Sequence, residues 1–402
     1  MRARSFLRAR WQPHGSLAGM PNLVEELKAL DPSVIARLNA NGFDETRFLA
    51  LAETLRDGDP ETRRRARNVV KGKVSPPPAS AMHKLPPEGS AEYERLRARG
   101  EAALRAGELA FCTMAGGMAT RMGGIVKALA EVYDGHSFLD LRLGENRSNS
   151  ARYGRPIPLW FMTSDATDEA IRKALEGVPD RAHIATFAQD LSLRLTPEGT
   201  LFFGADGKPS LYATGHGDLV DALRRSGLVD RFVAGGGKWV WITNVDNLGA
   251  SIDPVILGHF IEAAETAGAV VQCEVTRKEG DRGGIPVLAE GKVQVLEEFR
   301  LPADFDPKTV NVFNTNTFLV RAEALARQPC TWTYFEVEKK ADGRTAVQFE
   351  RLLQEITAQM PSVYLEVPRD GAASRFLPVK DFEELAKRRA NIEVVARARG
   401  MV

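Results

Sequence analysis

A glycine-rich segment at residues 114–127 (MAGGMATRMGGIVK) follows an apolar run and carries two basic side chains, Arg121 and Lys127. Glycines let a backbone approach a phosphate closely, and successive amides can form an anion-binding nest. The spacing matches neither the GxGxxG pattern of dinucleotide-binding folds nor the GxxxxGK[ST] pattern of P-loops. The segment therefore predicts an anion-binding loop of another kind, although a glycine-rich turn beside an arginine also arises by chance.

Further polar clusters follow at intervals along the chain. The most distinctive are GHGD (215–218), NVDNLGA (244–250), FNTN (313–316) and SRFLPVK (374–380). Asp246 comes soon after the apolar run at 239–243, and a carboxylate there could hold Mg²⁺ against phosphate oxygens, with water completing the octahedron. From the residues alone, an aspartate that caps a turn is the alternative.

These clusters need a scaffold, and from about Ala91 short apolar runs alternate with helical patterns. The predicted strands span 109–114, 157–163, 184–187, 239–243 and 270–276, and the predicted helices span 165–175, 219–225 and 254–267. Such alternation predicts an α/β domain with a mixed, mostly parallel sheet flanked by helices. Ligands of such sheets bind at the carboxyl ends of the strands, where the glycine-rich segment and Asp246 fall.

The first 90 residues have a different pattern. Apolar residues recur at helical spacing over 22–70, Asp31 precedes Pro32 as an N-cap, and prolines concentrate between 74 and 87. We expect an N-terminal helical region and linker over 1–90, an α/β domain that carries the chemistry over 91–385, and a short charged helical tail over 386–402. The arginine-rich start could be a transit peptide, but its apolar content is low, which favours a poorly ordered tail.

Composition narrows the class of protein. The 402 residues include 54 Lys and Arg against 53 Asp and Glu, a net charge of +1, which argues against nucleic acid as a partner. No apolar run is long enough for a membrane span, which argues against a membrane partner. The three cysteines lie far apart without a CxxC pair, which argues against disulfides or structural zinc and favours the cytoplasm.

In their order and spacing, the clusters resemble the UTP–glucose-1-phosphate uridylyltransferase (UDP-glucose pyrophosphorylase) family. The resemblance runs from about Leu109 to Leu385. It implies the Rossmann-like fold of nucleotide-diphospho-sugar transferases. It also implies a Mg²⁺-assisted enzyme that joins UTP and α-D-glucose 1-phosphate, by in-line attack on the α-phosphate, to give UDP-glucose and pyrophosphate.

The resemblance implies a role for each candidate residue. The catalytic residues would be Arg121, Lys127 and Lys380; the nucleotide-binding residues Ala115, Gly116, Gly117, Met162, Gln189 and Gly215; the sugar-phosphate-binding residues His216, Asn244, Gly284, Glu297, Asn314 and Asn316; and the Mg²⁺ ligand Asp246. The amide of Gln189 has a donor beside an acceptor, which matches the imide edge of uracil. Without the motifs, Gln189 and Lys380 would be surface residues at strand ends, His216 a core or surface histidine, and Glu297 an exposed strand residue.

The sequence departs from the family pattern in four places. Gly124-Ile125-Val126-Lys127 replaces the usual Gly-Pro-Lys, Arg282 replaces a common lysine, and Thr317 replaces a common second asparagine. Only residues 381–402 follow Lys380, so we expect a short form without the family's C-terminal β-helix module.

Two other functions remain as alternatives. One is a UDP-N-acetylhexosamine pyrophosphorylase, against which the glucose-type spelling of GHGD and FNTN argues. The other is a catalytically silent sugar-nucleotide sensor, against which the joint presence of Arg121, Lys127, Asp246 and Lys380 argues. The sequence does not predict the oligomeric state.

Overall fold

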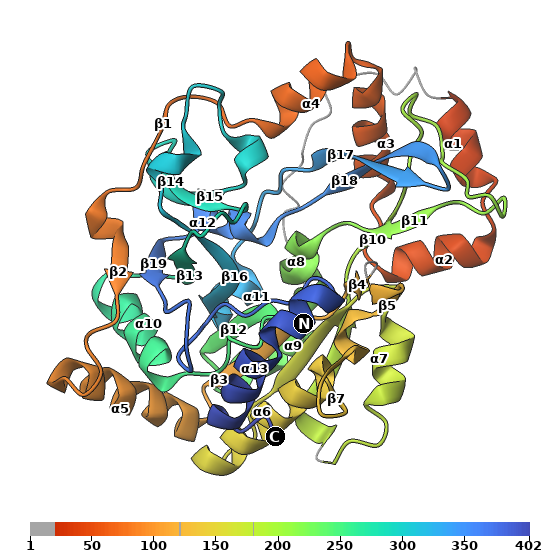
Figure 1. Ribbon diagram of the computed structural model, residues 1–402. Helices are drawn as coiled ribbons and strands as arrows, with labels where there is room; N and C mark the ends of the chain where they lie inside the picture. Colours follow the sequence, from red (N-terminus) through yellow and green to blue (C-terminus); the bar gives the residue numbers. More distant parts are fainter. Residues whose placement is uncertain (1–20, 120–121, 180) are drawn as a thin grey trace, which may run out of the picture. The chain divides into compact units, whose positions relative to one another are not determined.

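The chain divides into two compact units in the computed structural model, which describes residues 21–119, 122–179 and 181–402 (Figure 1). The first unit comprises the described residues up to Ala66 together with Leu191–Tyr212 and Glu336–Phe349. The second unit comprises Arg67–Asp190, Ala213–Phe335 and Glu350–Val402. The arginine-rich start of the chain lies outside the described residues.

The first unit contains the helices that the N-terminal apolar spacing predicts, together with two β-ribbons. Its helices are α1 (Pro21–Lys28), α2 (Pro32–Ala40), α3 (Glu45–Glu53) and α4 (Pro60–Asn68), and its strand pairs are β10 (Leu191–Leu193) with β11 (Leu211–Ala213) and β17 (Phe335–Ala341) with β18 (Arg344–Glu350). Some of these elements run a residue or two past the limits of the unit. Asp31 caps α2 by accepting a hydrogen bond from the backbone N–H of Ser33, as predicted.

The observed units differ from the predicted boundary at residue 90. Two segments that the sequence placed in the α/β domain instead join the N-terminal helices. The buried guanidinium of Arg63 donates two hydrogen bonds, of 2.9 and 2.8 Å, to the carboxylate of Glu336. The backbone N–H of Leu191 donates to the carbonyl oxygen of Asn41 at 2.9 Å. These contacts join residues far apart in sequence, so local patterns could not indicate them.

The second unit is built on an eight-stranded sheet in the order β2-β19-β13-β16-β12-β3-β8-β9 (Figure 1). The strands are β2 (Met82–Lys84), β19 (Ser362–Glu366), β13 (Val271–Arg277), β16 (Val312–Arg321), β12 (Trp239–Asn244), β3 (Leu109–Met114), β8 (Leu159–Thr163) and β9 (Ile184–Ala188). All neighbouring pairs are parallel except those of β16, which runs antiparallel to both β12 and β13. The prediction of a mixed, mostly parallel sheet is therefore confirmed.

Smaller strands and the helices complete this unit. The small strands are β1 (Val74–Ser75) with β14 (Ile285–Ala289) and β15 (Lys292–Leu296), β4 (Met118–Ala119) with β5 (Ile125–Val126), and β6 (Glu131–Tyr133) with β7 (His136–Ser137). The helices are α5 (Ala91–Ala106), α6 (Phe138–Tyr153), α7 (Asp168–Ala174), α8 (Leu219–Arg225), α9 (Leu228–Ala234), α10 (Pro254–Thr266), α11 (Ala322–Arg327), α12 (Ile356–Gln359) and α13 (Phe382–Ala398). No helix in the described part of the chain has the length and apolar character needed to span a membrane.

The strands form a buried layer because successive side chains point to opposite faces of the sheet. In β12, Trp239 and Trp241 enter one apolar cluster, whereas Val240 and Ile242 enter a second. The first cluster includes side chains of α5, α6, α10 and α13. The second includes side chains of α8, α9, α11 and α12. Residues 386–402, predicted as a short charged helical tail, belong largely to α13, and its buried side chains pack on the core.

The reversed direction of β16 determines where the FNTN motif lies. An antiparallel strand brings its N-terminal end to the edge where its parallel neighbours have their carboxyl ends. Phe313 pairs with Thr276 and Asn314 with Val275, near the end of β13. The motif therefore lies at the same edge of the sheet as the residues that follow β3 and β12.

Candidate active site

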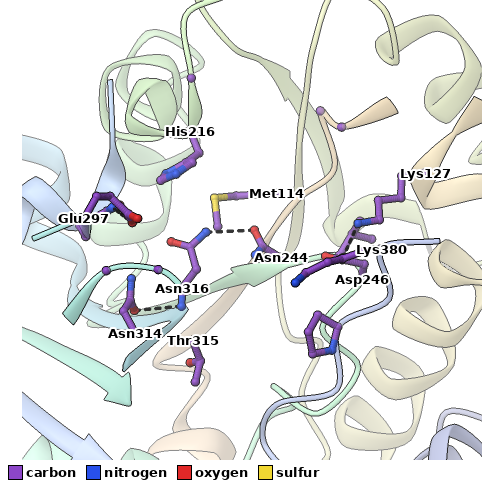
Figure 2. A pocket seen from close by; sticks show the side chains of 18 of the residues that line it. Met114, Lys127, His216, Asn244, Asp246, Glu297, Asn314, Thr315, Asn316 and Lys380 are labelled. Atoms are coloured by element: carbon purple, nitrogen blue, oxygen red, sulfur yellow. Dashed lines mark hydrogen bonds and ion pairs between the residues drawn. The ribbon is translucent and has the colours of Figure 1, made fainter. Parts of the chain in front are cut away.

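A cleft of about 630 Å³ opens at this edge of the sheet, within the second unit (Figure 2). Its lining includes the predicted residues Gly116, Gly117, Lys127, Met162, Gln189, Gly215, His216, Asn244, Asp246, Gly284, Glu297, Asn314, Asn316 and Lys380. Arg121 lies outside the described residues. Ala115 does not line the cleft, because its side chain is buried in the core and its N–H donates to the carbonyl oxygen of Met162 at 2.7 Å.

The glycine-rich segment forms one wall of the cleft. The Ser164 hydroxyl donates to the carbonyl oxygen of Gly116 at 2.8 Å and fixes that peptide. A Cβ atom at Gly116 would lie 2.2 Å from Oε1 of Gln189, so only glycine permits this approach. Ile125 and Val126, which depart from the family pattern, form β5 and pair with β4. Lys127 follows directly at the edge of the cleft.

Gln189 lies just past the carboxyl end of β9 and is almost completely buried. Its Nε2 donates to the carbonyl oxygen of Gly215 at 2.8 Å, and its backbone N–H donates to Thr163 at 2.9 Å. These contacts fix the orientation of the side-chain amide. They leave one N–H and the Oε1 acceptor beside Gly116, the donor and acceptor pair that an imide edge requires.

His216 begins the turn that the GHGD motif forms. Its Nδ1 accepts a hydrogen bond of 3.0 Å from the backbone N–H of Leu353, so in the neutral ring Nε2 carries the proton. Burial lowers the pKa of His216 to about 4, while the charge of Glu350 opposes this shift. Near neutral pH the ring is therefore an uncharged hydrogen-bond donor at the cleft (Figure 2).

Protonation of His216 is expected to destabilise the protein as the pH falls. An unfolded histidine titrates near pH 6.5, whereas the folded pKa is about 4, so the unfolded state binds more protons between these values. The contribution to stability is complete above pH 6.5 and is lost as the pH falls toward 4. Urea unfolding at about pH 7 and about pH 5 should show a smaller loss for His216→Gln than for the unaltered protein. Equal losses of unfolding free energy in both proteins would contradict the lowered pKa of His216.

The FNTN motif supplies amides whose orientations are set by the protein. Asn316 has a left-handed backbone, with φ of 57°, beside the bulge at which the register of β13 and β16 shifts. Its N–H donates to Oδ1 of Asn314 at 2.9 Å, and its Nδ2 donates to Oδ1 of Asn244 at 3.1 Å (Figure 2). Oδ1 of Asn314 also accepts from the Cys273 thiol, so Nδ2 is the donor that remains for a ligand.

Two buried acceptors beside these amides lack a partner. Oδ1 of Asn316 and Oε1 of Gln354 have no hydrogen bond among the described residues. The Nε2 group of Gln354 donates to Oε1 of Glu297 at 2.5 Å, and the backbone of Gly284 also donates to Glu297. Burial, and then the charge of Glu298, raises the pKa of Glu297. Unpaired buried acceptors are costly, and both of these belong to residues that line the cleft. Sequence reasoning missed Gln354, which belongs to no motif.

The opposite end of the cleft is cationic (Figure 2). Lys127 Nζ forms an ion pair with Oδ2 of Asp246. The other carboxylate oxygen, Oδ1, accepts no hydrogen bond from a described residue. Lys380 is exposed and lines the same end, with its backbone N–H donating to Glu384 at 2.7 Å. The two lysines near the carboxylate of Asp246 suit a ligand with several negative charges, such as a triphosphate that binds together with a divalent metal ion.

Buried arginines hold the loop that carries Asp246. Arg142 donates to the carbonyl oxygen of Ala250 at 3.0 Å, and Arg375 donates to Ser251 at 2.7 Å and to Glu274. Asn247 links this loop to the SRFLPVK segment, because its Oδ1 accepts from the backbone N–H of Leu377 at 2.8 Å. The loops that carry Asp246 and Lys380 are therefore fixed against each other.

Comparisons with known proteins agree with this fold and identify the family of the chain. Residues 64–398 match the family model described as UTP–glucose-1-phosphate uridylyltransferase. A UTP–glucose-1-phosphate uridylyltransferase of Hordeum vulgare is 33% identical over 288 residues, which cover 67% of this chain and 59% of that protein. The chain spans less than two thirds of the length of the curated relatives it matches.

Solved structures share the fold at lower identity. The uridine diphosphate N-acetylglucosamine pyrophosphorylase of Trypanosoma brucei has a TM-score of 0.73 and 21% identity, covering 94% of this chain and 82% of that one. A Trypanosoma brucei structure described as UDP-glucose phosphorylase has a TM-score of 0.70 and 21% identity, covering 88% of this chain and 77% of that one. The second unit thus has the α/β fold of the nucleotidyltransferase-type pyrophosphorylases. Within that class, the chain belongs to the UTP–glucose-1-phosphate uridylyltransferase family.

Proposed function

We propose that the chain forms UDP-glucose and pyrophosphate from UTP and α-D-glucose 1-phosphate. The observation that supports this most is the chemical division of one cleft into three parts. Gln189 offers an amide beside Gly116 at the base end. Asn314, Asn316 and Glu297 offer oriented polar groups for a hexose. Lys127 and Lys380 supply positive charge for phosphates.

The reaction would need little covalent work from the protein. An oxygen of the sugar phosphate attacks the α-phosphorus of UTP and forms a new P–O bond. The bond between the α-phosphorus and the bridging oxygen breaks, and pyrophosphate leaves with that electron pair. The protein positions two anions and stabilises the charge that develops, which is the role we assign to Lys127 and Lys380. Arg121 remains a proposed catalytic residue on the basis of the resemblance alone.

We also propose that Asp246 holds Mg²⁺. No group of three or more possible ligands occurs among the described His, Cys, Asp and Glu residues, so an all-protein metal site is not indicated there. A single carboxylate that lines the cleft near two lysines suits Mg²⁺, which usually binds one or two carboxylates, substrate phosphates and water. When bound, the metal would neutralise phosphate charge. Lys127 would then turn from Asp246 toward the phosphates.

Gln189→Ala is expected to weaken UTP binding and to reduce discrimination against CTP. The alanine would leave the imide edge of the bound uracil without its hydrogen-bond partners, at a cost of about 1–3 kcal/mol in binding free energy. Isothermal titration with UTP and CTP measures both effects. If the affinities for both nucleotides stayed unchanged, the base would have to be recognised elsewhere.

A panel of sugar 1-phosphates tests the proposed function directly. Pyrophosphate release would be measured with UTP, Mg²⁺ and the 1-phosphates of glucose, galactose, N-acetylglucosamine and N-acetylgalactosamine. We expect the highest kcat/KM with glucose 1-phosphate. A preference for an N-acetylated sugar would replace the proposal with a UDP-N-acetylhexosamine pyrophosphorylase. Binding of UDP-glucose without turnover of any sugar would indicate a sensor.

We propose a cytoplasmic location and small-molecule substrates as the partners. Cys112 and Cys273 are buried free thiols, and Cys330 is also free. Free cysteines are typical of a reducing compartment. The near balance of charges gives no support to nucleic-acid binding.

A further inference from the structure

Behind the cleft, the buried guanidinium of Arg351 contacts three carboxylates. Nε donates to Asp218 at 2.8 Å, Nη1 donates to Asp221 at 2.6 Å, and Nη2 donates to Asp190 at 2.6 Å. The side chain is 1% exposed. The rings of Trp332 and Tyr334 lie 5.6 Å from its central carbon. Neither Arg351 nor the three aspartates line the cleft.

The backbone of Arg351 belongs to the same cluster. Its N–H donates to the carbonyl oxygen of Thr214 at 2.7 Å, and its carbonyl oxygen accepts from Gly217 at 3.1 Å. The N–H of Thr214 donates to the carbonyl oxygen of Asp190 at 3.2 Å, and its hydroxyl donates to Asp218 at 2.8 Å. Three segments distant in sequence are therefore joined at one point.

Each of these segments carries a residue that lines the cleft. Gln189 precedes Asp190, and His216 lies in the turn between Thr214 and Asp218. Gln354 follows Arg351 by three residues. The Arg351 cluster thus lies directly behind the base-binding amide, the neutral histidine and an unpaired buried amide.

The glycines of the GHGD turn are needed for this arrangement. A Cβ atom at Gly215 would lie 2.4 Å from the carbonyl oxygen of Arg351, and one at Gly217 would lie 2.8 Å from its carbonyl carbon. Gly215 also has a φ of 100°, a left-handed conformation that favours glycine. The turn can therefore lie this close to the backbone of Arg351 only because both positions are glycine.

We infer that Arg351 is a positioning residue that sets both base recognition by Gln189 and sugar-phosphate binding by His216. This inference rests on the proposed function for the identity of the two ligands. A planar guanidinium presents its donors in fixed, widely spread directions, and the compact ammonium group of lysine does not reproduce this geometry. Replacement of Arg351 would leave the buried carboxylates without their cationic partner and would release the segments that these carboxylates anchor.

The test compares Asp190→Asn with Asp221→Asn. Each removes one carboxylate charge from the same guanidinium, but Asp190 adjoins a residue that lines the cleft. Asp190 is also more buried than Asp221, with 5% against 37% of the side chain exposed, and it pairs with Arg225 as well. Asp190→Asn should raise the KM for UTP about tenfold. It should also lower the ratio of turnover with UTP to turnover with CTP. Asp221→Asn should keep both values within about twofold. Arg351→Lys should raise the KM for UTP and for glucose 1-phosphate together.

A merely structural role would give a different result. Loss of folded protein lowers kcat per total protein, but it leaves KM and the UTP to CTP ratio of the remaining active protein unchanged. Unchanged KM values and ratio in Asp190→Asn and Arg351→Lys would therefore overturn the inference.

Amide hydrogen exchange tests the positioning role of Arg351 independently of turnover. Arg351→Lys should lose protection over residues 186–191 and 213–218, while Asp221→Asn keeps it. If both segments kept full protection in Arg351→Lys, the inference would be wrong. If the unaltered protein had no activity but Arg351→Lys still lost protection that Asp221→Asn kept, only the proposed function would be wrong.

Discussion

Lys380→Met is expected to lower kcat by about 10²–10³, with a smaller change in the KM for UTP. As charge develops on the α-phosphate and the leaving pyrophosphate, a fixed cation gains attraction that it lacked in the ground state. Such an interaction raises the rate more than the affinity. Leu377 and Val379 are buried, and the ring of Phe376 packs edge-on against Phe313 at 5.0 Å. The segment that carries Lys380 is therefore anchored, although the ammonium group itself is accessible.

Two further variants separate this role from that of an ordinary surface lysine. Lys380→Arg should not restore full activity, because a planar fork does not replace a compact charge. Lys387→Met is the matched control, since Lys387 is an exposed lysine on α13 that pairs with Glu383 and lies outside the cleft. Its kcat should equal that of the unaltered protein. Steady-state kinetics with circular dichroism would decide, and an unchanged kcat in folded Lys380→Met would end the hypothesis.

The sequence predicted most of the sheet because its central parallel strands β3, β8, β12 and β13 are buried on both faces. The predicted strands correspond to β3, β8, β9, β12 and β13, with ends that differ by a residue or two. Continuous apolar runs bounded by turn residues are typical of such strands. The antiparallel β16 was missed, because the polar residues 314–317 interrupt its apolar sequence and a register shift lies near Asn316. Its direction follows from pairing with distant strands, which no local pattern specifies.

The candidate site was predicted to the extent that its residues fall within motifs. The described residues of the predicted site line one cleft, except Ala115, whose side chain is buried in the core. Gln354 and Arg351 were missed, since neither belongs to a motif. Both act through contacts across the chain: Gln354 with Glu297, and Arg351 with Asp190. Such contacts arise only when the sheet brings separate segments together.

Asp246→Asn is expected to lower kcat by about 10²-fold or more and to shift the Mg²⁺ dependence to higher concentration. An amide is neutral and a weaker Mg²⁺ ligand than a carboxylate. The fold should persist, because the loop is held by Arg142, Arg375 and Asn247 rather than by Asp246. Turnover would be measured across a Mg²⁺ titration at saturating UTP. Rates near those of the unaltered protein at low Mg²⁺ would contradict the assignment.

The ion pair between Asp246 and Lys127 requires a control, because removing the carboxylate also frees the lysine. Lys127→Met removes the same ion pair while keeping the carboxylate. If Asp246 acts on the metal, Lys127→Met should lower kcat but leave the midpoint of the Mg²⁺ titration unchanged or lower, because a competing cation is gone. If Asp246 only orients Lys127, both variants should lose activity to a similar extent with the same Mg²⁺ midpoint. A raised midpoint in Asp246→Asn alone therefore identifies the carboxylate as the metal ligand.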